Sequence, residues 1–256
     1  MNKNNIYIIP DKDNLDEYTD YANKHGFHFE YNDFFVPDFL DNKEDLDKRI
    51  ALYTNFSNLP SNNTMHGSFL DVTIFSADKA IREHSRKRLR ESMDIAKKLN
   101  AKAVIMHTNY IPNFLEEYYL ENWVDQNEQF IRELLKDYPD ICIYMENMFD
   151  MVPEQLLKLA EKLQDEPNFG ICFDYAHATV FGSADTLYWA EKLAPYVKHV
   201  HINDNDTLHD QHLALGDGKM DIDKFIDIYE KYFPDSSLLL EMNGLDKIIK
   251  SVDRLF

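Results

Sequence analysis

The sequence predicts an α/β fold in one domain, residues 1–256: a closed ring of eight parallel strands surrounded by helices, the (β/α)8 or TIM barrel. Two observations lead to this prediction. Short apolar runs alternate with longer amphipathic segments eight times along the chain. Six of these runs stop at a histidine, aspartate or glutamate, and successive stops lie roughly 27 to 41 residues apart, the length of one strand–loop–helix–loop unit.

The first half of the chain holds four strand and helix pairs. Pro10 ends the first strand, Gly26 separates the first helix from the second strand, and Pro139 follows the fourth helix. The helix at 77–99 has apolar residues on one face and arginines and lysines on the other. The expected elements are strand 5–9, helix 15–24, strand 27–31, helix 44–56, strand 63–68, helix 77–99, strand 103–107 and helix 114–138.

The second half repeats this order. Pro153 lies near the first turn of its helix, where proline is favoured. The expected elements are strand 141–146, helix 153–164, strand 169–174, helix 185–196, strand 197–202, helix 221–232, strand 237–240 and helix 245–256. Parallel barrel strands are buried on both faces, and their C-terminal ends meet at one mouth. We therefore expect the polar residues that stop the runs to converge there.

Composition is consistent with one large core and a cytoplasmic protein. The chain is 44% hydrophobic and 13% aromatic, with only 7 Gly and 9 Pro and no linker-like stretch. Cys142 and Cys172 lie inside apolar runs, which predicts reduced core thiols. The N-terminal apolar run is too short for a signal peptide, and no run reaches the roughly 18 to 20 residues of a membrane span.

The formal net charge of −19 argues against nucleic acid or anionic lipid as a partner, because such a surface repels phosphate at long range. Acidic helix faces that only maintain solubility are the simpler interpretation of the same number. A small-molecule partner is compatible with both.

The ends of four consecutive strands offer Glu146, Asp174, His201 and Glu241. Each alone fits a solvated acid or a hydrogen-bonded histidine at a strand end. Three carboxylates gathered at one mouth would raise one another's pKa, and a divalent cation relieves that repulsion. Carboxylate and imidazole together suit Mn²⁺, Co²⁺, Mg²⁺ or Zn²⁺. The four residues therefore predict one metal ion.

A second set of polar residues surrounds these four: His66, His107, His177, Asp210 and His212. An imidazole-rich set suits zinc, so up to three ions are possible, and binding of the substrate is an equally open role. Asp204 is a further candidate donor in the loop after His201. Gly216, Asp217 and Gly218 predict a turn closing over the site. Phe69, Tyr110, Phe149 and Tyr175 follow the strand ends and could stack on a polyol or pack in the core.

Together these motifs resemble the xylose isomerase-like barrel superfamily, which includes sugar isomerases and epimerases and endonuclease-IV-type apurinic endonucleases. The resemblance spans about Ile6 to Glu241. Its motifs are HGSF at His66, MH at His107, YMEN at Glu146, CFDYAH at Asp174 and His177, HVHINDND at His201, DQHLALGDG at Asp210 and His212, and LLLE at Glu241.

The isomerase pattern implies a divalent-metal-dependent enzyme of carbohydrate metabolism. Glu146, Asp174, His201 and Glu241 would bind the metal, and Glu146 and Glu241 would also move the α proton of a sugar or polyol derivative through a metal-stabilised enediolate. The lysine that xylose isomerases place soon after the strand-five glutamate is absent, since Asn147 follows Glu146. With no Arg or Lys between His201 and Lys219, a neutral sugar fits better than a phosphorylated one.

The endonuclease pattern is the alternative: a zinc-dependent phosphodiesterase on apurinic or apyrimidinic DNA. It implies that all nine residues bind a three-zinc cluster, and all nine positions match. The charge and the arginine-free loop after the second strand, NDFFVPDFLDNKED, argue against it. A barrel that binds a metabolite without turning it over is a third hypothesis.

Overall fold

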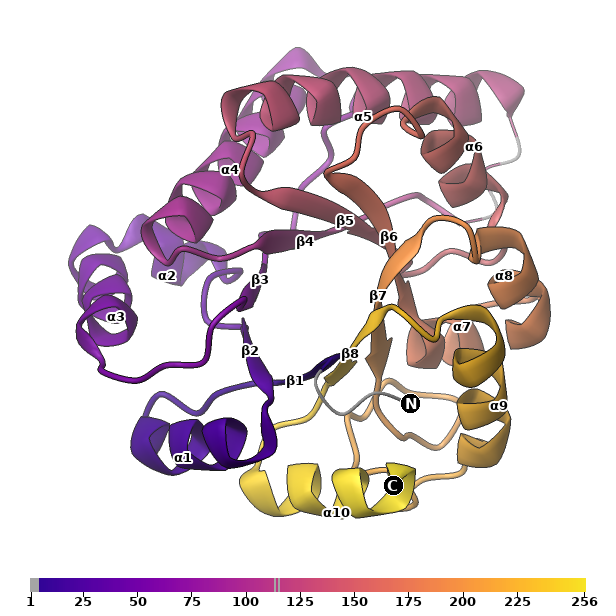
Figure 1. Ribbon diagram of the computed structural model, residues 1–256. Coiled ribbons are helices and arrows are strands. Elements are labelled where there is room, and N and C mark those ends of the chain that lie inside the picture. The colour runs from indigo at the N-terminus through magenta and orange to yellow at the C-terminus, as the bar shows by residue number, and fades with distance from the viewer. Residues whose placement is uncertain (1–4, 113, 115) are drawn as a thin grey trace.

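The strands of the computed structural model, which describes residues 5–112, 114 and 116–256, close into the predicted parallel barrel (Figure 1). Their order around the ring is their order in the chain, and β1 pairs with β8 to close it. The strands are β1 (Ile6–Ile8), β2 (His28–Tyr31), β3 (Thr64–His66), β4 (Ala103–His107), β5 (Cys142–Glu146), β6 (Phe169–Asp174), β7 (Val197–Ile202) and β8 (Ser237–Leu240).

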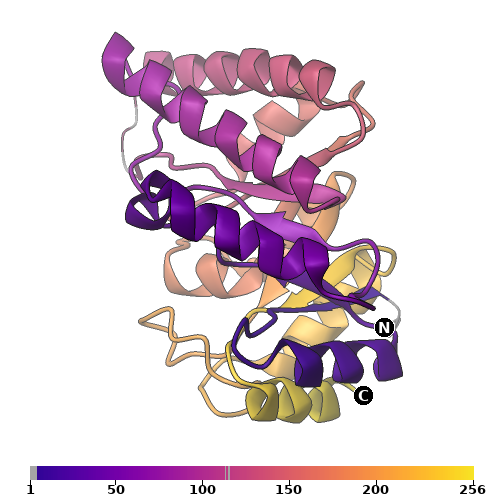
Figure 2. The same cartoon turned by 90° about the vertical axis from the view of Figure 1, so that its left-hand side faces the viewer.

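Helices cover the outside of this ring, as the two perpendicular views show (Figures 1 and 2). None of them, in the part of the chain that is described, is long and apolar enough to cross a membrane. They are α1 (Leu15–His25), α2 (Pro37–Asp41), α3 (Lys43–Asn55), α4 (Lys79–Lys98), α5 (Glu117–Asp137), α6 (Glu154–Lys162), α7 (Tyr175–Val180), α8 (Thr186–Leu193), α9 (Ile222–Tyr232) and α10 (Leu245–Leu255).

The eight expected strands and eight expected helices are present, with ends shifted by a few residues. The predicted start of the fourth helix at 114 falls beside residues 113 and 115, which lie outside the described residues. Two short helices were not predicted. Pro37 begins α2 at a position where its missing N–H costs nothing, and the Asp174 side chain caps α7.

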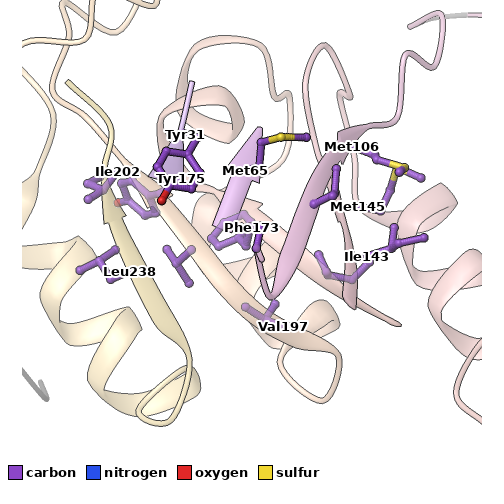
Figure 3. Close-up of a cluster of buried hydrophobic side chains, with 14 of the residues drawn as sticks. Tyr31, Met65, Met106, Ile143, Met145, Phe173, Tyr175, Val197, Ile202 and Leu238 are labelled. Carbon is purple, nitrogen blue, oxygen red and sulfur yellow. The ribbon is translucent and has the colours of Figure 1, made fainter. Parts of the chain in front are cut away.

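The main core lies between the strands and the helices. Alternate strand residues point outward into this layer, and Figure 3 shows part of it, including Met65, Met106 and Met145 from β3, β4 and β5. The apolar cluster inside the ring is small and consists of Tyr7, Ile9 and Leu239.

Much of the barrel interior is polar. Glu30, Thr64 and His199 lie on the inward side of their strands and are each at most 2% exposed. Buried polar groups are costly unless they are paired. We therefore expect these side chains to hydrogen-bond to one another or to take part in the function of the protein.

The strand ends place the predicted site residues at one mouth. His66, His107, Glu146 and Asp174 are the last residues of β3, β4, β5 and β6. The register pairs His107 with Glu146 and Asp174 with His201. Cys142 and Cys172, on neighbouring strands β5 and β6, are free thiols.

Candidate metal centre at the barrel mouth

Four of the predicted residues meet at one point. Glu146, Asp174, His201 and Glu241 each offer a ligand atom, and these atoms all lie within 4.8 Å of one another. Glu146, Asp174 and His201 are completely buried, and Glu241 is 6% exposed. The four side chains come from β5, β6, β7 and the residue after β8.

The atoms that converge there lack hydrogen-bond partners within the described residues. They are both carboxylate oxygens of Glu146, Oδ2 of Asp174, Nδ1 of His201 and Oε2 of Glu241. A buried carboxylate oxygen that accepts no hydrogen bond is costly, because removing one ion from water costs on the order of several kcal/mol. Three oxygen donors and one nitrogen donor suit a divalent cation, so the donor set fits the predicted ion.

The electrostatics of the group point the same way. Burial raises the pKa of Asp174 well above its ordinary value, and the neighbouring Glu241 and Glu146 carboxylates raise it further against the opposing effect of His177. Burial alone would lower the pKa of His201, but Cys172 and the surrounding carboxylates raise it well above its ordinary value. The site therefore favours added positive charge.

Asn147, the residue after Glu146, aligns the ends of β5 and β6. Its side-chain amide donates to the carbonyl oxygen of Asp174 at 2.8 Å, and its Oδ1 accepts from the Asp174 N–H at 2.9 Å. Asp174 Oδ1 in turn accepts the His177 N–H at 2.5 Å as the cap of α7. Oδ2 of Asp174 is thereby left facing the other ligand atoms.

Three of the surrounding histidines are held in one orientation by backbone carbonyls. His66, His177 and His212 place Nδ1 at 2.9, 2.9 and 2.7 Å from the carbonyl oxygens of Gly67, Asn147 and Glu241. A carbonyl oxygen can only accept, so Nδ1 carries the proton and donates. Nε2 of each ring then faces the mouth, where it can serve as the ligand atom for a metal ion, the arrangement typical of metal-binding histidines.

These Nε2 atoms face further ligand-type atoms. His66, His107 and Glu146 form a second group of ligand atoms within 4.8 Å, and it shares Glu146 with the first. His107 Nε2 lies 3.0 Å from Glu146 Oε2 and 3.0 Å from His66 Nε2. On the opposite side, Asp210 Oδ2 lies 3.3 Å from His177 Nε2 and 2.9 Å from His212 Nε2. The structure thus brings all nine predicted residues to one mouth.

Asp204, also proposed as a donor, has a different role. Its Oδ2 accepts the N–H groups of Gly216 and Gly218 at 2.8 and 2.9 Å. Its Oδ1 accepts those of Asn205 and Met220 at 2.8 and 3.1 Å. The carboxylate is therefore used to fold the loop that carries Asp210 and His212. Gly216 adopts φ +91°, which supports the predicted turn.

A cavity of about 610 Å³ opens above the four-residue group, and Glu241 lines it together with His66, His107, His177, Asp210 and His212. Phe69 is the one of the four proposed stacking aromatics that lines the cavity, and Phe35 packs beside it with ring centroids 5.2 Å apart. Tyr175 packs instead in the core against Phe225, with ring centroids 5.1 Å apart.

Sequence reasoning missed several residues of this region, among them Phe35, Glu30 and His199. Phe35 belongs to the loop after β2, and Glu30 and His199 lie below the four-residue group inside the ring. The only available signal for Glu30 was a single acid in the otherwise aromatic run FHFEY, and His199 repeats the inward position of His201 two residues earlier.

Solved structures resemble this chain over nearly its full length. The TTHB071 protein of Thermus thermophilus, soaked with ZnCl2, has a TM-score of 0.76 at 23% identity and covers 98% of this chain and 96% of its own. A D-tagatose 3-epimerase-like protein has a TM-score of 0.73 at 22% identity, covering 97% and 95%. At these identities the likeness establishes the fold.

The relatives found by sequence match a smaller part of this chain than the solved structures do. The uncharacterized protein MJ1311 of Methanocaldococcus jannaschii is 28% identical over 203 residues, which are 75% of this chain and 68% of the relative. A probable endonuclease 4 of Mycobacterium leprae is 25% identical over 173 residues, 63% of this chain and 66% of that protein. The sequence profile described as "Xylose isomerase-like TIM barrel" matches residues 19–255. Because that match covers most of the chain, the protein belongs to the xylose isomerase-like TIM barrel family.

Proposed function

We propose that this protein is a divalent-metal-dependent isomerase or epimerase acting on a small carbohydrate or polyol derivative. The observation that carries the proposal is the pair of glutamates in the four-residue group. Glu146 ends β5 and Glu241 follows β8, and both lie beside His201 Nδ1, with oxygens at 3.2 and 3.6 Å. Two carboxylates at one site are what abstraction and return of a proton require.

The two glutamates differ in access. Glu241 lines the cavity, whereas Glu146 is completely buried between the histidines of β3 and β4 and His201. We therefore assign Glu241 as the base that first meets the substrate and Glu146 as the group that returns a proton or holds the metal. A divalent ion bound by the four residues would supply charge stabilisation for the enediolate.

The walls of the cavity suit a neutral, hydroxylated ligand. Asn32 and Asn243 offer amides, Asp11 and Asp33 offer carboxylates, and Phe35 and Phe69 offer an apolar face. Lys12 is the only Lys or Arg among the lining residues, and its ammonium lies 2.5 Å from Asp13. A phosphorylated sugar would need more positive charge than this wall supplies.

The direct test is turnover of Glu241→Gln on a panel of ketoses and aldoses in heavy water. We expect the variant to lose about 10²- to 10⁴-fold in turnover, the usual contribution of one acid–base group. Its ligand affinity should change little, and deuterium should enter the α carbon of the product made by the unaltered protein. Glu17→Gln, the same change at an exposed position of α1, is the matched control.

The metal content of Glu241→Gln must be measured beside its activity, because Glu241 is also a candidate ligand. A variant that retains its metal and its full activity would refute the assignment of Glu241 as the base. Loss of activity together with loss of metal would support the ligand role alone.

A second function, phosphodiester hydrolysis of the endonuclease IV kind, is favoured by one specific observation. The carbonyl-oriented histidines and Asp210 add ligand groups on both sides of the four-residue group, and Glu146 is shared with one of them. Two or more ions bridged in this way are typical of phosphoester-cleaving sites. The acidic cavity wall and the charge of −19 oppose binding of a DNA backbone.

Counting ions per chain by elemental mass spectrometry separates the two functions. About one ion would support the isomerase, and close to three zinc ions with metal-dependent incision of abasic DNA would replace it with the nuclease. His212→Gln should lose an ion only if several are bound. His209→Gln is the matched control, because His209 lies in the same loop with its side chain 73% exposed.

A further inference from the structure

Glu30 is a completely buried carboxylate that belongs to none of the nine predicted residues. It lies on β2 inside the ring, directly below the four-residue group. Its Oε1 is 3.2 Å from Nε2 of His201, and its Oε2 is 3.2 Å from Nε2 of His199. The Thr64 hydroxyl donates to Oε2 at 2.7 Å.

The Glu30 carboxylate is therefore held by two imidazole rings and one hydroxyl group, with no Lys or Arg among these contacts. A carboxylate accepts hydrogen bonds and donates none, so it holds a ring nitrogen directly only when that nitrogen carries a proton, whereas a metal ion between the two removes this requirement.

The neighbouring groups are compatible with one arrangement of protons. His199 Nδ1 is 2.6 Å from the Ser237 hydroxyl, whose single proton can go either to Nδ1 or to the carbonyl oxygen of Lys198 at 3.2 Å. Donation to Nδ1, the shorter contact, leaves the proton of the His199 ring on Nε2, toward Glu30.

Within the described residues, neither His201 Nε2 nor Glu30 Oε1 has a hydrogen-bond partner that satisfies both distance and angle, and the 3.2 Å contact between them brings the two atoms together. His201 Nδ1 faces Glu146 and Glu241, so a metal ion held by the four-residue group would take the lone pair of Nδ1 and leave the proton of the ring on Nε2, toward Glu30.

We propose that Glu30 is a positioning residue for the metal centre, which fixes the tautomer and the ring orientation of His201 so that Nδ1 is the ligand atom. The inference rests on the metal centre of the proposed function but not on the identity of the substrate. Ligand histidines commonly donate their second ring N–H to such a partner, and loss of that partner typically costs 10- to 100-fold in metal affinity.

The first test uses the unaltered protein. Nitrogen-15 NMR of histidine-labelled protein, with and without zinc, reports which ring nitrogen of His201 carries the proton. We expect Nε2–H in the zinc-bound form. A proton on Nδ1 would overturn the inference, and this result does not depend on any variant folding.

The second test compares affinities for Zn²⁺ and Co²⁺ alone, measured by chelator competition. Glu30→Gln should bind about 10- to 100-fold more weakly, with an altered Co²⁺ absorption spectrum. Thr64→Val is the control, because it removes the hydroxyl donor to Glu30 without changing His201 or His199, and its affinity should stay near that of the parent protein. Equal affinities for Glu30→Gln and its parent would refute the positioning role.

Two further outcomes separate this inference from the proposed function. Loss of one whole ion per chain in Glu30→Gln would mean that Glu30, His199 and His201 hold an ion themselves, which overturns the inference and leaves the four-residue group intact. Absence of metal binding by the unaltered protein would overturn both. If Glu30→Gln weakens Zn²⁺ binding as expected but the unaltered protein turns over no sugar, only the proposed isomerase activity is refuted.

Discussion

Gly218 occupies a point in the loop after β7 where a side chain has no room. A Cβ atom there would lie 2.2 Å from Oδ1 of Asp204 and 2.4 Å from the carbonyl oxygen of Asn205. The Gly218 N–H donates to the same Asp204 carboxylate. Because Gly218 has no side chain, the Asp204 carboxylate can hydrogen-bond to several backbone N–H groups of the loop that carries Asp210 and His212.

Replacement of Gly218 by alanine should lower the free energy of unfolding by about 1–3 kcal/mol, the usual cost of overpacking. The contacts are with backbone and a buried carboxylate, which cannot move aside easily. Urea unfolding measures the change. Lys219→Ala, at the exposed neighbouring position, should stay within about 0.5 kcal/mol of the parent protein. A Gly218→Ala variant as stable as the parent would contradict this account of the loop.

At the scale of the element, the segment between β7 and α9 begins with a turn organised by Asp206. The Asp206 carboxylate accepts the N–H groups of Leu208 and His209 at 2.9 and 2.8 Å, and it lies 3.0 Å from His209 Nδ1. The His209 side chain is the largest cause that lowers the pKa of Asp206, from 3.8 to about 2. This turn leads directly to Asp210.

The lowered pKa of Asp206 sets a pH window for the turn. Its contribution to stability is present above pH 3.8, where the unfolded chain is also ionised, and is lost as the pH falls from 3.8 through about 2. The carboxyl carbon of Asp206, followed by NMR from pH 5 to 3, should stay in its ionised position at pH 3.5. In His209→Ala it should already be shifting there, and identical titrations would show that His209 has no such effect.

Prediction from sequence succeeded for elements with a clear period and failed for those without one. The strand ends at His107, Glu146 and Asp174 could be placed because apolar runs stop there with the repeat of a barrel. Helices α2 and α7 have five and six residues, too few for a 3.6-residue period to show. Glu30 was missed because an acid in an alternating strand usually faces solvent, and only the closed ring turns that position inward.

The candidate site was also predicted only in part. Which residues could bind a metal was readable from residue type and spacing, and the structure brings these residues together. The tautomers of His66, His177 and His212 were not readable, because they depend on carbonyl groups of residues that are distant in the chain or on a local backbone bend. The roles assigned to all nine residues remain predictions until metal binding is measured.

At the scale of the whole molecule, the candidate ion joins four consecutive strands, β5 to β8, whose ligands are up to 95 residues apart in the chain, so it should bind the folded chain and not the unfolded one. Zinc at 100 times its dissociation constant should add about 2.7 kcal/mol to the free energy of unfolding. For a chain of this size that raises the melting temperature by roughly 5–10 °C. A chelator should reverse the shift, and Asp174→Asn should reduce it. Unchanged melting with and without metal would count against the centre.

The pairing of β1 with β8 also has a consequence during translation. Ile6 pairs with Leu238, so ring closure waits until almost all the described chain has left the ribosome. Until then Glu146, Asp174 and His201 lack Glu241, and the nascent chain exposes an unclosed sheet edge that can pair with other chains. We therefore expect the nascent chain to benefit from chaperone binding until β8 has been synthesised.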